Sequence, residues 1–363
     1  MIFIKINSIK PFILSLFSLK TPTRNLGLDI IRAIAIGLVL FEHLGLNPYP
    51  IIRLGGFGVE LFFVLSGFLI GGILLKEFDK FDGIKTIKHF WIKRWFRTLP
   101  LYYLALLLQI VLSKKIKWEY LYYFVFLQNN FYGINLFSVS WSLVIEEWFY
   151  LMLPFIFLGI TLLIKKVKTL SIVFSILAFM LLKYFIINVN EMQIGAVHGN
   201  FLLRADTMLI GVLLASIKKE LPLFFQKLAE IKFFIFSFIS IVIIQFFGFV
   251  YFGVSEINKS VTIITLLYPL QSLCIALSFP FITDSSFINQ KLYKIMPFSQ
   301  FIVWTSILSY SFYLFHFNVF HSVQDIYSGP GLLILKIVAL YLFSFFLYKL
   351  YEKPFTDLRN NFA

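Results

Sequence analysis

Long apolar segments alternate with short polar ones along nearly the whole chain. Ten of these segments have the length that a helix needs to cross a bilayer, which is about 20 residues. The pattern therefore predicts an all-α fold, a polytopic transmembrane helical bundle of about ten spans. The expected spans cover residues 28–46, 55–75, 97–112, 142–164, 170–188, 201–217, 232–252, 260–280, 301–321 and 331–350.

Two further segments do not fit as spans. Residues 121–131 are apolar and aromatic but too short to cross, so we expect them to lie at the interface or to re-enter. Residues 1–24 lack a small-residue cleavage site, which indicates a cytoplasmic or interfacial amphipathic arm and not a signal peptide. Residues 25–356 would then form one membrane domain, and residues 357–363 a cytoplasmic tail.

Composition supports a membrane setting. Hydrophobic residues make up 60% of the 363 residues and charged residues only 14%, whereas soluble domains carry about 25% charged residues. The single Cys274 excludes an intramolecular disulfide and a CxxC metal site, and no zinc spacing is visible, so no metal is expected. In a chain this apolar, the net charge of +14 indicates membrane topology and not nucleic-acid binding.

Basic residues are distributed unevenly between alternate loops. Most of the 32 Lys and Arg residues lie in the amino-terminal arm, in the loops after even-numbered spans and in the carboxyl tail. Cytoplasmic loops carry the excess of Lys and Arg, so both termini are predicted to be cytoplasmic. An even number of spans also places both termini on the same side of the membrane. The expected location is the cell membrane, plasma or inner, with multiple passes.

Arg32 and His43 share one apolar stretch, with ten residues between them. On an α-helix, eleven steps of about 100° end about 20° past three full turns, so both side chains point to one face. The same steps span about 16 Å along the helix axis. Ionisable groups inside a membrane span are costly and usually functional, which makes this pair the leading candidate for chemistry.

Applying the predicted orientation separates the ionisable residues of the spans into two layers. The inner layer is expected to be purely basic, with Arg32, Arg94 and Arg97 near the cytoplasmic side. The outer layer is expected to hold His43 and the remaining candidates, which are Glu60, Glu146, Glu147, Arg204, Asp206 and His316. Arg204 and Asp206 are two residues apart, so they should not face each other on a helix.

The two layers suggest a long donor with phosphates inside and a reactive end outside. Arg pairs bidentately with phosphate, which makes Arg32, Arg94 and Arg97 candidate ligands of such a donor. His43 suits general-base work, and we expect an acid such as Glu146 to orient its ring. Glu146 and Glu147 lie about 100° apart, so only one of them can face the site squarely. Acyl-coenzyme A has the required shape.

Six segments, in this order, resemble the motifs of the acyltransferase 3 family of integral membrane acyltransferases. They are GLDIIRA (27–33) continuing to His43, GVELFFVLSGFLI (58–70), RWFRTLPLY (94–102), WSLVIEEWFY (141–150), SYSFYLFH (309–316) and EKPF (352–355). The likeness runs from about residue 26 to residue 355. It departs from the family pattern at Glu60, where Asp is usual, and at Trp148, where Gln is frequent.

The resemblance implies transfer of an acyl group, often acetyl, from cytoplasmic acyl-CoA to a hydroxyl of an extracytoplasmic glycan or lipid-linked sugar. It favours Glu146 over Glu147 as the key acid. We therefore expect His43, Glu146 and Arg32 to act in catalysis, and Arg94, Arg97 and Arg32 to hold the donor, with acyl-CoA as co-substrate. The expected partners are acyl-CoA, the glycan acceptor and the lipid bilayer, with no nucleic acid. Because the sequence ends at Ala363, we expect no appended extracytoplasmic esterase-like domain.

Each candidate also has a structural alternative. Arg32 could be a snorkelling anchor, Arg94 and Arg97 could only enforce topology, and His316 could be a packing residue. A transporter or exporter would also place ionisable residues at mid-membrane, but the chain lacks an inverted repeat with paired Gly/Pro-broken spans. A structural membrane partner of a glycan-assembly complex would tolerate Ala at Arg32 and His43.

Overall fold

The computed structural model describes residues 24–46, 53–130, 135–251, 253–285, 288 and 295–358. Most of the predicted amino-terminal arm and of the carboxyl tail therefore lies outside the described residues. All regular secondary structure within these ranges is helical, in agreement with the all-α prediction. The α-helices are α2 (Leu26–His43), α3 (Leu54–Phe78), α4 (Gly83–Ser113), α5 (Leu121–Phe124), α6 (Trp141–Ile164), α7 (Thr169–Val189), α8 (Ile194–His198), α9 (Ala205–Glu220), α10 (Pro222–Leu228), α11 (Ile231–Gln245), α12 (Gly253–Ile257), α13 (Val261–Asp284), α14 (Met296–Ile326), α15 (Leu332–Leu347) and α16 (Lys353–Leu358).

Among the described residues, seven helical stretches are long and apolar enough to cross a membrane. They are 54–78, 83–113, 138–164, 169–189, 231–248, 261–284 and 332–358, and each contains all or most of one predicted span. The other three predicted spans correspond to α2, α9 and α14. Helix α2 carries three charged residues in 18, and α9 has only 16 residues. The multi-pass arrangement is thus supported, and the count of ten stays a prediction.

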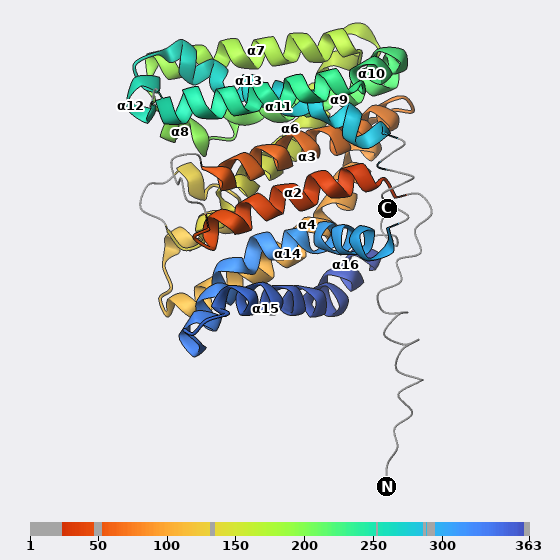
Figure 1. Ribbon diagram of the computed structural model, residues 1–363. Helices are drawn as coiled ribbons and strands as arrows, with labels where there is room; N and C mark the ends of the chain where they lie inside the picture. The colour runs from red at the N-terminus through yellow and green to blue at the C-terminus, as the bar shows by residue number, and fades with distance from the viewer. Residues whose placement is uncertain are drawn as a thin grey trace.

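The helices lie side by side in one bundle (Figure 1). Helices α7, α11 and α13 form one edge, α14 and α15 form the other, and α2 and α3 lie between them. Helix α2 packs against both α3 and α14, which brings the first and one of the last helices of the chain together. Segment 121–131 contributes α5 and the short 3-10 helix Gln128–Asn130, both too short to cross.

Helices α3 and α9 approach each other very closely. A Cβ on Gly67 would collide with the carbonyl of Met208, and one on Gly211 would collide with the carbonyl of Val64. Small residues allow helix backbones to approach this closely in membrane proteins. The contact fixes α3, which carries Glu60 and Ser66 toward two different clusters of polar residues.

Local sequence signals position α2 and α3 where these helices begin. The Asn25 side chain accepts a hydrogen bond from the Leu28 backbone N–H at 3.1 Å and so caps α2. Glu42 accepts from the Gly55 backbone N–H at 2.8 Å, which places a carboxylate at the amino end of α3. The end of α2 is therefore tied directly to the start of α3.

Both ends of the described chain lie at the same end of the bundle. Arg24 contacts Ser306, and Lys349 lies 5.6 Å from the ring of Trp304 on the same stretch of α14. An even number of spans requires this arrangement. The side of the membrane that this end faces stays a prediction.

One predicted span is only part of a longer helix, and this affects the site. The third span was expected to begin near residue 97, but α4 begins at Gly83. Buried Ile87 and Phe90 continue the apolar face of α4 through the basic stretch before Arg94. Arg94 and Arg97 consequently lie within one continuous helix and not at its start.

Candidate active site

Arg32 and His43 both contact α14. Arg32 Nη1 donates a hydrogen bond to Ser306 Oγ at 3.0 Å, and His43 Nδ1 lies 2.8 Å from His316 Nε2. Higher residue numbers on α2 meet higher numbers on α14, so the two helices run in the same direction. The prediction that Arg32 and His43 share one helix face is confirmed.

The hydrogen bonds of His316 assign the tautomers of the histidine pair. His316 Nδ1 lies 2.9 Å from the Tyr313 carbonyl and 3.1 Å from the Phe312 carbonyl. A carbonyl can only accept, so Nδ1 carries the proton and Nε2 of neutral His316 is an acceptor. His43 must then donate from Nδ1, which leaves its Nε2 with a free lone pair. His316 is fully buried and His43 is exposed, so the unprotonated nitrogen belongs to the accessible ring.

The three predicted donor-binding arginines come together in one cavity. Arg32, Arg94 and Arg97 line a space of about 200 Å³ between α2, α3, α4, α6 and α14. Ser66 and Glu146 also line it, and Glu146 is the only carboxylate among its described lining residues. Its remaining surface is mostly apolar, from α3 and α6. We call this space the basic cavity.

Glu146 lies in the basic cavity and not beside His43. Its carboxylate accepts from Ser66 Oγ at 2.9 Å and from the Tyr150 hydroxyl at 3.1 Å, and it lies 3.7 Å from Arg94 Nη2. Arg94 Nη2 also donates to the Tyr150 hydroxyl at 2.6 Å. Among the described residues Glu146 makes no contact with His43. The expectation that Glu146 orients His43 is therefore wrong, because α6 turns this side chain toward α3 and α4, and His316 takes that place.

Glu147 points into a different space, as the angle of about 100° between neighbouring helix positions requires. It lines an apolar pocket of about 300 Å³ with Trp95, Tyr103 and Trp148. Glu147 is 7% exposed. Of the two adjacent carboxylates, Glu146 is thus the one that faces the arginines.

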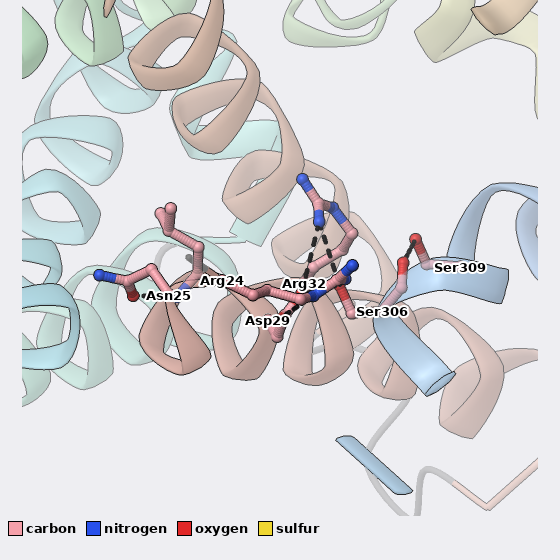
Figure 2. Close-up of polar contacts among 7 residues, drawn as sticks. Arg24, Asn25, Asp29, Arg32, Ser306 and Ser309 are labelled. Carbon is pink, nitrogen blue, oxygen red and sulfur yellow. Dashed lines mark hydrogen bonds and ion pairs between the residues drawn. The ribbon is translucent and has the colours of Figure 1, made fainter. Parts of the chain in front are cut away.

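A second acidic group holds Arg32 in place. Both carboxylate oxygens of Asp29 accept hydrogen bonds from Arg24, with Nε–Oδ2 and Nη2–Oδ1 distances of 2.6 Å. Asp29 Oδ1 also accepts a hydrogen bond from Ser306 Oγ at 2.6 Å (Figure 2). Arg32 Nη1 lies 3.8 Å from Asp29 Oδ1. Sequence analysis did not select Asp29 as a site residue, although its position three residues before Arg32 is a usual spacing for a helical ion pair. Ser306 carried no such signal.

Glu60, Arg204 and Asp206 form a separate buried cluster with Lys183. Arg204 pairs with Glu60, and Lys183 Nζ binds Asp206 Oδ2 at 3.0 Å. The four side chains come from α3, α7 and the start of α9, and the Arg204 guanidinium lies 3.6 Å from the ring centre of Tyr268 on α13. As predicted, Arg204 and Asp206 face different partners. We call these four residues the ionic cluster; none of them lines the basic cavity as the described residues define it.

The two predicted layers therefore need correction. The inner layer is not purely basic, since Glu146 and Asp29 lie among its arginines. The predicted outer layer divides into two parts. One is the His43–His316 pair between α2 and α14, and the other is the ionic cluster between α3, α7 and the start of α9. Ser66, Tyr150 and Lys183 were not predicted as partners, because contacts between helices bring them to Glu146, Arg94 and Asp206.

Comparison with known proteins identifies the family of the chain. A family model described as an acyltransferase domain, Acyl_transf_3, matches residues 25–349. A Staphylococcus aureus (strain COL) protein whose name describes it as a "Putative O-acetyltransferase" is 34% identical over 212 residues, covering 52% of this chain and 34% of its own length. The peptidoglycan O-acetyltransferase OatA of Listeria monocytogenes is 32% identical over 148 residues, covering 35% of this chain and 23% of its own length.

A further relative is the O-acetyltransferase OatA of Staphylococcus aureus (strain NCTC 8325 / PS 47), which is 30% identical over 218 residues and is covered over 34% of its length. The chain thus spans at most about a third of the length of these curated relatives. No solved structure matches the chain. The family model extends over most of the sequence, including both histidines of the pair and all three arginines of the basic cavity, and on this basis the chain belongs to the acyltransferase 3 family.

Proposed function

We propose that this protein is a membrane O-acyltransferase that uses cytoplasmic acyl-CoA, with acetyl-CoA as the first donor to test. The acceptor is a hydroxyl of an extracytoplasmic glycan or lipid-linked sugar, and the location is the cell membrane. The observation that carries the proposal is the His43–His316 pair, which holds an accessible unprotonated nitrogen at the end of α2. Membership of the family and the names of the relatives support the class of reaction.

The basic cavity suits the donor. It brings three guanidinium groups together against one carboxylate, so its lining carries a surplus of positive charge. Arginine is well matched to phosphate because its planar fork can donate two parallel hydrogen bonds. Arg32, Arg94 and Arg97 would hold the phosphates or the pantetheine arm, and Glu146 would position Arg94.

The pair suits general-base catalysis. His43 Nε2 takes the proton of the acceptor hydroxyl while His43 Nδ1–H donates to His316, which steadies the imidazolium that forms. The hydroxyl oxygen bonds to the thioester carbonyl carbon and the C–S bond breaks, so coenzyme A leaves as thiolate and receives the proton from His43. In a two-step variant, His43 is acylated first and then passes the acyl group to the hydroxyl.

Coenzyme A release by purified, detergent-solubilised protein tests the proposal. Acetyl-CoA is supplied with and without an envelope glycan extract, to wild type, His43→Ala and the double variant Arg94→Ala/Arg97→Ala. We expect release that needs the extract, is lost with His43→Ala and requires much more acetyl-CoA in the double variant. Full activity of His43→Ala would overturn both chemical routes. Normal donor dependence of the double variant would remove only the donor site.

The transporter hypothesis finds no support in these observations. It requires substrate movement without consumption of coenzyme A, whereas the family to which the chain belongs is one of acyltransferases. The same assay separates the two, since a transporter releases no coenzyme A under any of the conditions.

A further inference from the structure

A groove lies directly beside the histidine pair. It has a volume of about 300 Å³ and is formed by α4, the segment before α6 and one face of α14. Its polar lining residues are Gln109, Ser138, Asn318 and His321, and Phe317 is among its apolar ones. Ser138 and His321 are exposed, so the groove is open at its polar edge. We call it the lateral groove.

Phe317 belongs to both the lateral groove and the histidine pair. Its ring centre lies 4.6 Å from that of His43 and 4.5 Å from that of His316. On its other side it faces His321 at 6.1 Å, with the two rings nearly parallel at 18°. Phe317 therefore connects the lateral groove to the histidine pair.

The amide side chains of the groove keep unused hydrogen-bonding groups. Gln109 Nε2 donates to Asn318 Oδ1 at 2.8 Å, which aligns the two amides. Gln109 Oε1 and Asn318 Nδ2 have no hydrogen-bond partner among the described residues, so one acceptor and one donor remain available side by side. Such a pairing of fixed acceptor and donor is suited to adjacent hydroxyl groups of a ligand.

Tyr313 links the lateral groove to the basic cavity. It lines the basic cavity, and its hydroxyl donates to the carbonyl of Val139, a groove residue, at 2.9 Å. The same hydroxyl lies 2.7 Å from Ser142 Oγ, which also lines the basic cavity. One tyrosine side chain thus contacts both spaces one helical turn from His316.

We propose that the lateral groove binds a pyranose ring of the acceptor saccharide and presents one of its hydroxyls to His43 Nε2. This inference rests on the proposed function and names the acceptor class of the same site. A pyranose has an apolar C–H face that suits Phe317 and hydroxyls that suit Gln109 and Asn318; such a mixture of aromatic and a few fixed polar groups is typical of ligand pockets. The pocket beside Glu147 lacks both amides and contact with His43.

Saccharide binding without any acyl donor tests the groove independently of catalysis. Saturation-transfer NMR on detergent-solubilised protein would use a tetrasaccharide of N-acetylglucosamine, with glucose and galactose as further probes. We expect binding by wild type and at least tenfold weaker binding by Asn318→Leu and by Gln109→Leu. His321→Ala, at an exposed position, should weaken binding by a smaller factor without affecting folding. The matched control is Ser322→Ala, which is exposed on the same turn outside the groove and should bind as wild type.

A kinetic readout separates failure of the groove from failure of the proposed function. In the coenzyme A release assay, Asn318→Leu should raise the acceptor KM about tenfold or more and leave the acetyl-CoA KM unchanged. The groove proposal is overturned if Asn318→Leu, Gln109→Leu and His321→Ala all bind saccharide as wild type does. It is also overturned if wild type binds none of the three saccharides. If these variants abolish saccharide binding but the wild-type protein never releases coenzyme A, the groove proposal stands and the acyltransferase proposal is overturned.

Discussion

Ionisable side chains gather in two parts of the bundle, and their surroundings differ. In the ionic cluster two carboxylates, Glu60 and Asp206, meet two cations, Arg204 and Lys183, and all four are buried. In the basic cavity three arginines, Arg32, Arg94 and Arg97, line a hollow beside a single lining carboxylate. The ionic cluster is thus balanced and closed, whereas the basic cavity is unbalanced and hollow.

The difference indicates what each set of charges does. A buried charge is tolerated when a partner offsets its desolvation, so a balanced set can join helices without any ligand. A cavity lined by more cations than carboxylates favours an anion that enters. The histidine pair extends this second region, because it keeps one nitrogen without a partner among the described residues. We therefore expect substitutions in the basic cavity and the histidine pair to change activity, and those in the ionic cluster to change stability.

His316→Phe is the most severe test of the active region. It keeps a ring of similar size but removes the acceptor that fixes the His43 tautomer, so turnover should fall by roughly 10²–10⁴-fold. The unfolding midpoint in detergent should stay near that of wild type. His316→Gln supplies a carbonyl acceptor and should recover part of the turnover. Wild-type turnover by His316→Phe would show that His43 does not depend on this partner.

Arg204→Met tests the ionic cluster. Removal of one partner leaves Glu60 buried and unpaired, which should cost about 3–5 kcal/mol of stability. A lowered thermal unfolding midpoint measures the effect, and the acetyl-CoA KM of the folded fraction should be unchanged. The double variant Arg204→Met/Glu60→Leu should regain much of the loss, since no unpaired charge remains. A double variant no more stable than the single one would contradict the balanced-pair explanation.

The two adjacent glutamates provide a matched comparison within one helix. Glu146→Gln removes the charge that faces Arg94 but keeps the size of the side chain. We expect a loss of about 1–2 kcal/mol of interaction energy, which corresponds to a change of roughly five- to thirtyfold in the acetyl-CoA KM. Glu147→Gln should leave this KM unchanged because Glu147 lines the other pocket. Titration of initial rates with acetyl-CoA measures both. Equal effects of the two variants would mean that the division of the two side chains has no functional meaning.

Ser306→Ala should have the smallest effect. It removes the hydroxyl that links Arg32 to Asp29, a loss of about 0.5–1.5 kcal/mol for one hydrogen bond. The acetyl-CoA KM should rise a few-fold, with turnover nearly unchanged because the histidine pair is intact. Ser311→Ala, at a buried position of the same helix that does not line the basic cavity, serves as the control. An effect as large as that of Glu146→Gln would mean that Ser306 contacts the donor directly.

Several features of the site followed from helix periodicity. Arg32 and His43 both contact α14, and Arg204 and Asp206 have separate partners, as their spacing predicts. Glu146 and Glu147 point into different spaces for the same reason. Each of these relations lies within one helix or its first turn, where geometry depends only on the number of intervening residues.

Relations between helices were not predictable in this way. The partner of His43 is His316, which sequence analysis had placed in the same layer but not in contact with it. Glu146 was expected at His43 and lies instead with Ser66 and Arg94. The choice depends on how each helix is rotated about its axis and how deeply it is set in the bundle, and neither quantity is encoded in spacing along one segment.

Residue order alone was enough to establish a helical membrane protein, the family motifs and the faces on which the ionisable residues lie. Packing decided the rest: α3 and α9 approach each other closely at Gly67 and Gly211, and α2 lies against α14 so that the two histidines meet. The physical reason is the distance along the chain over which each kind of interaction acts. Backbone geometry fixes directions within a helix, whereas contacts between segments hundreds of residues apart are selected by shape and charge across the whole bundle.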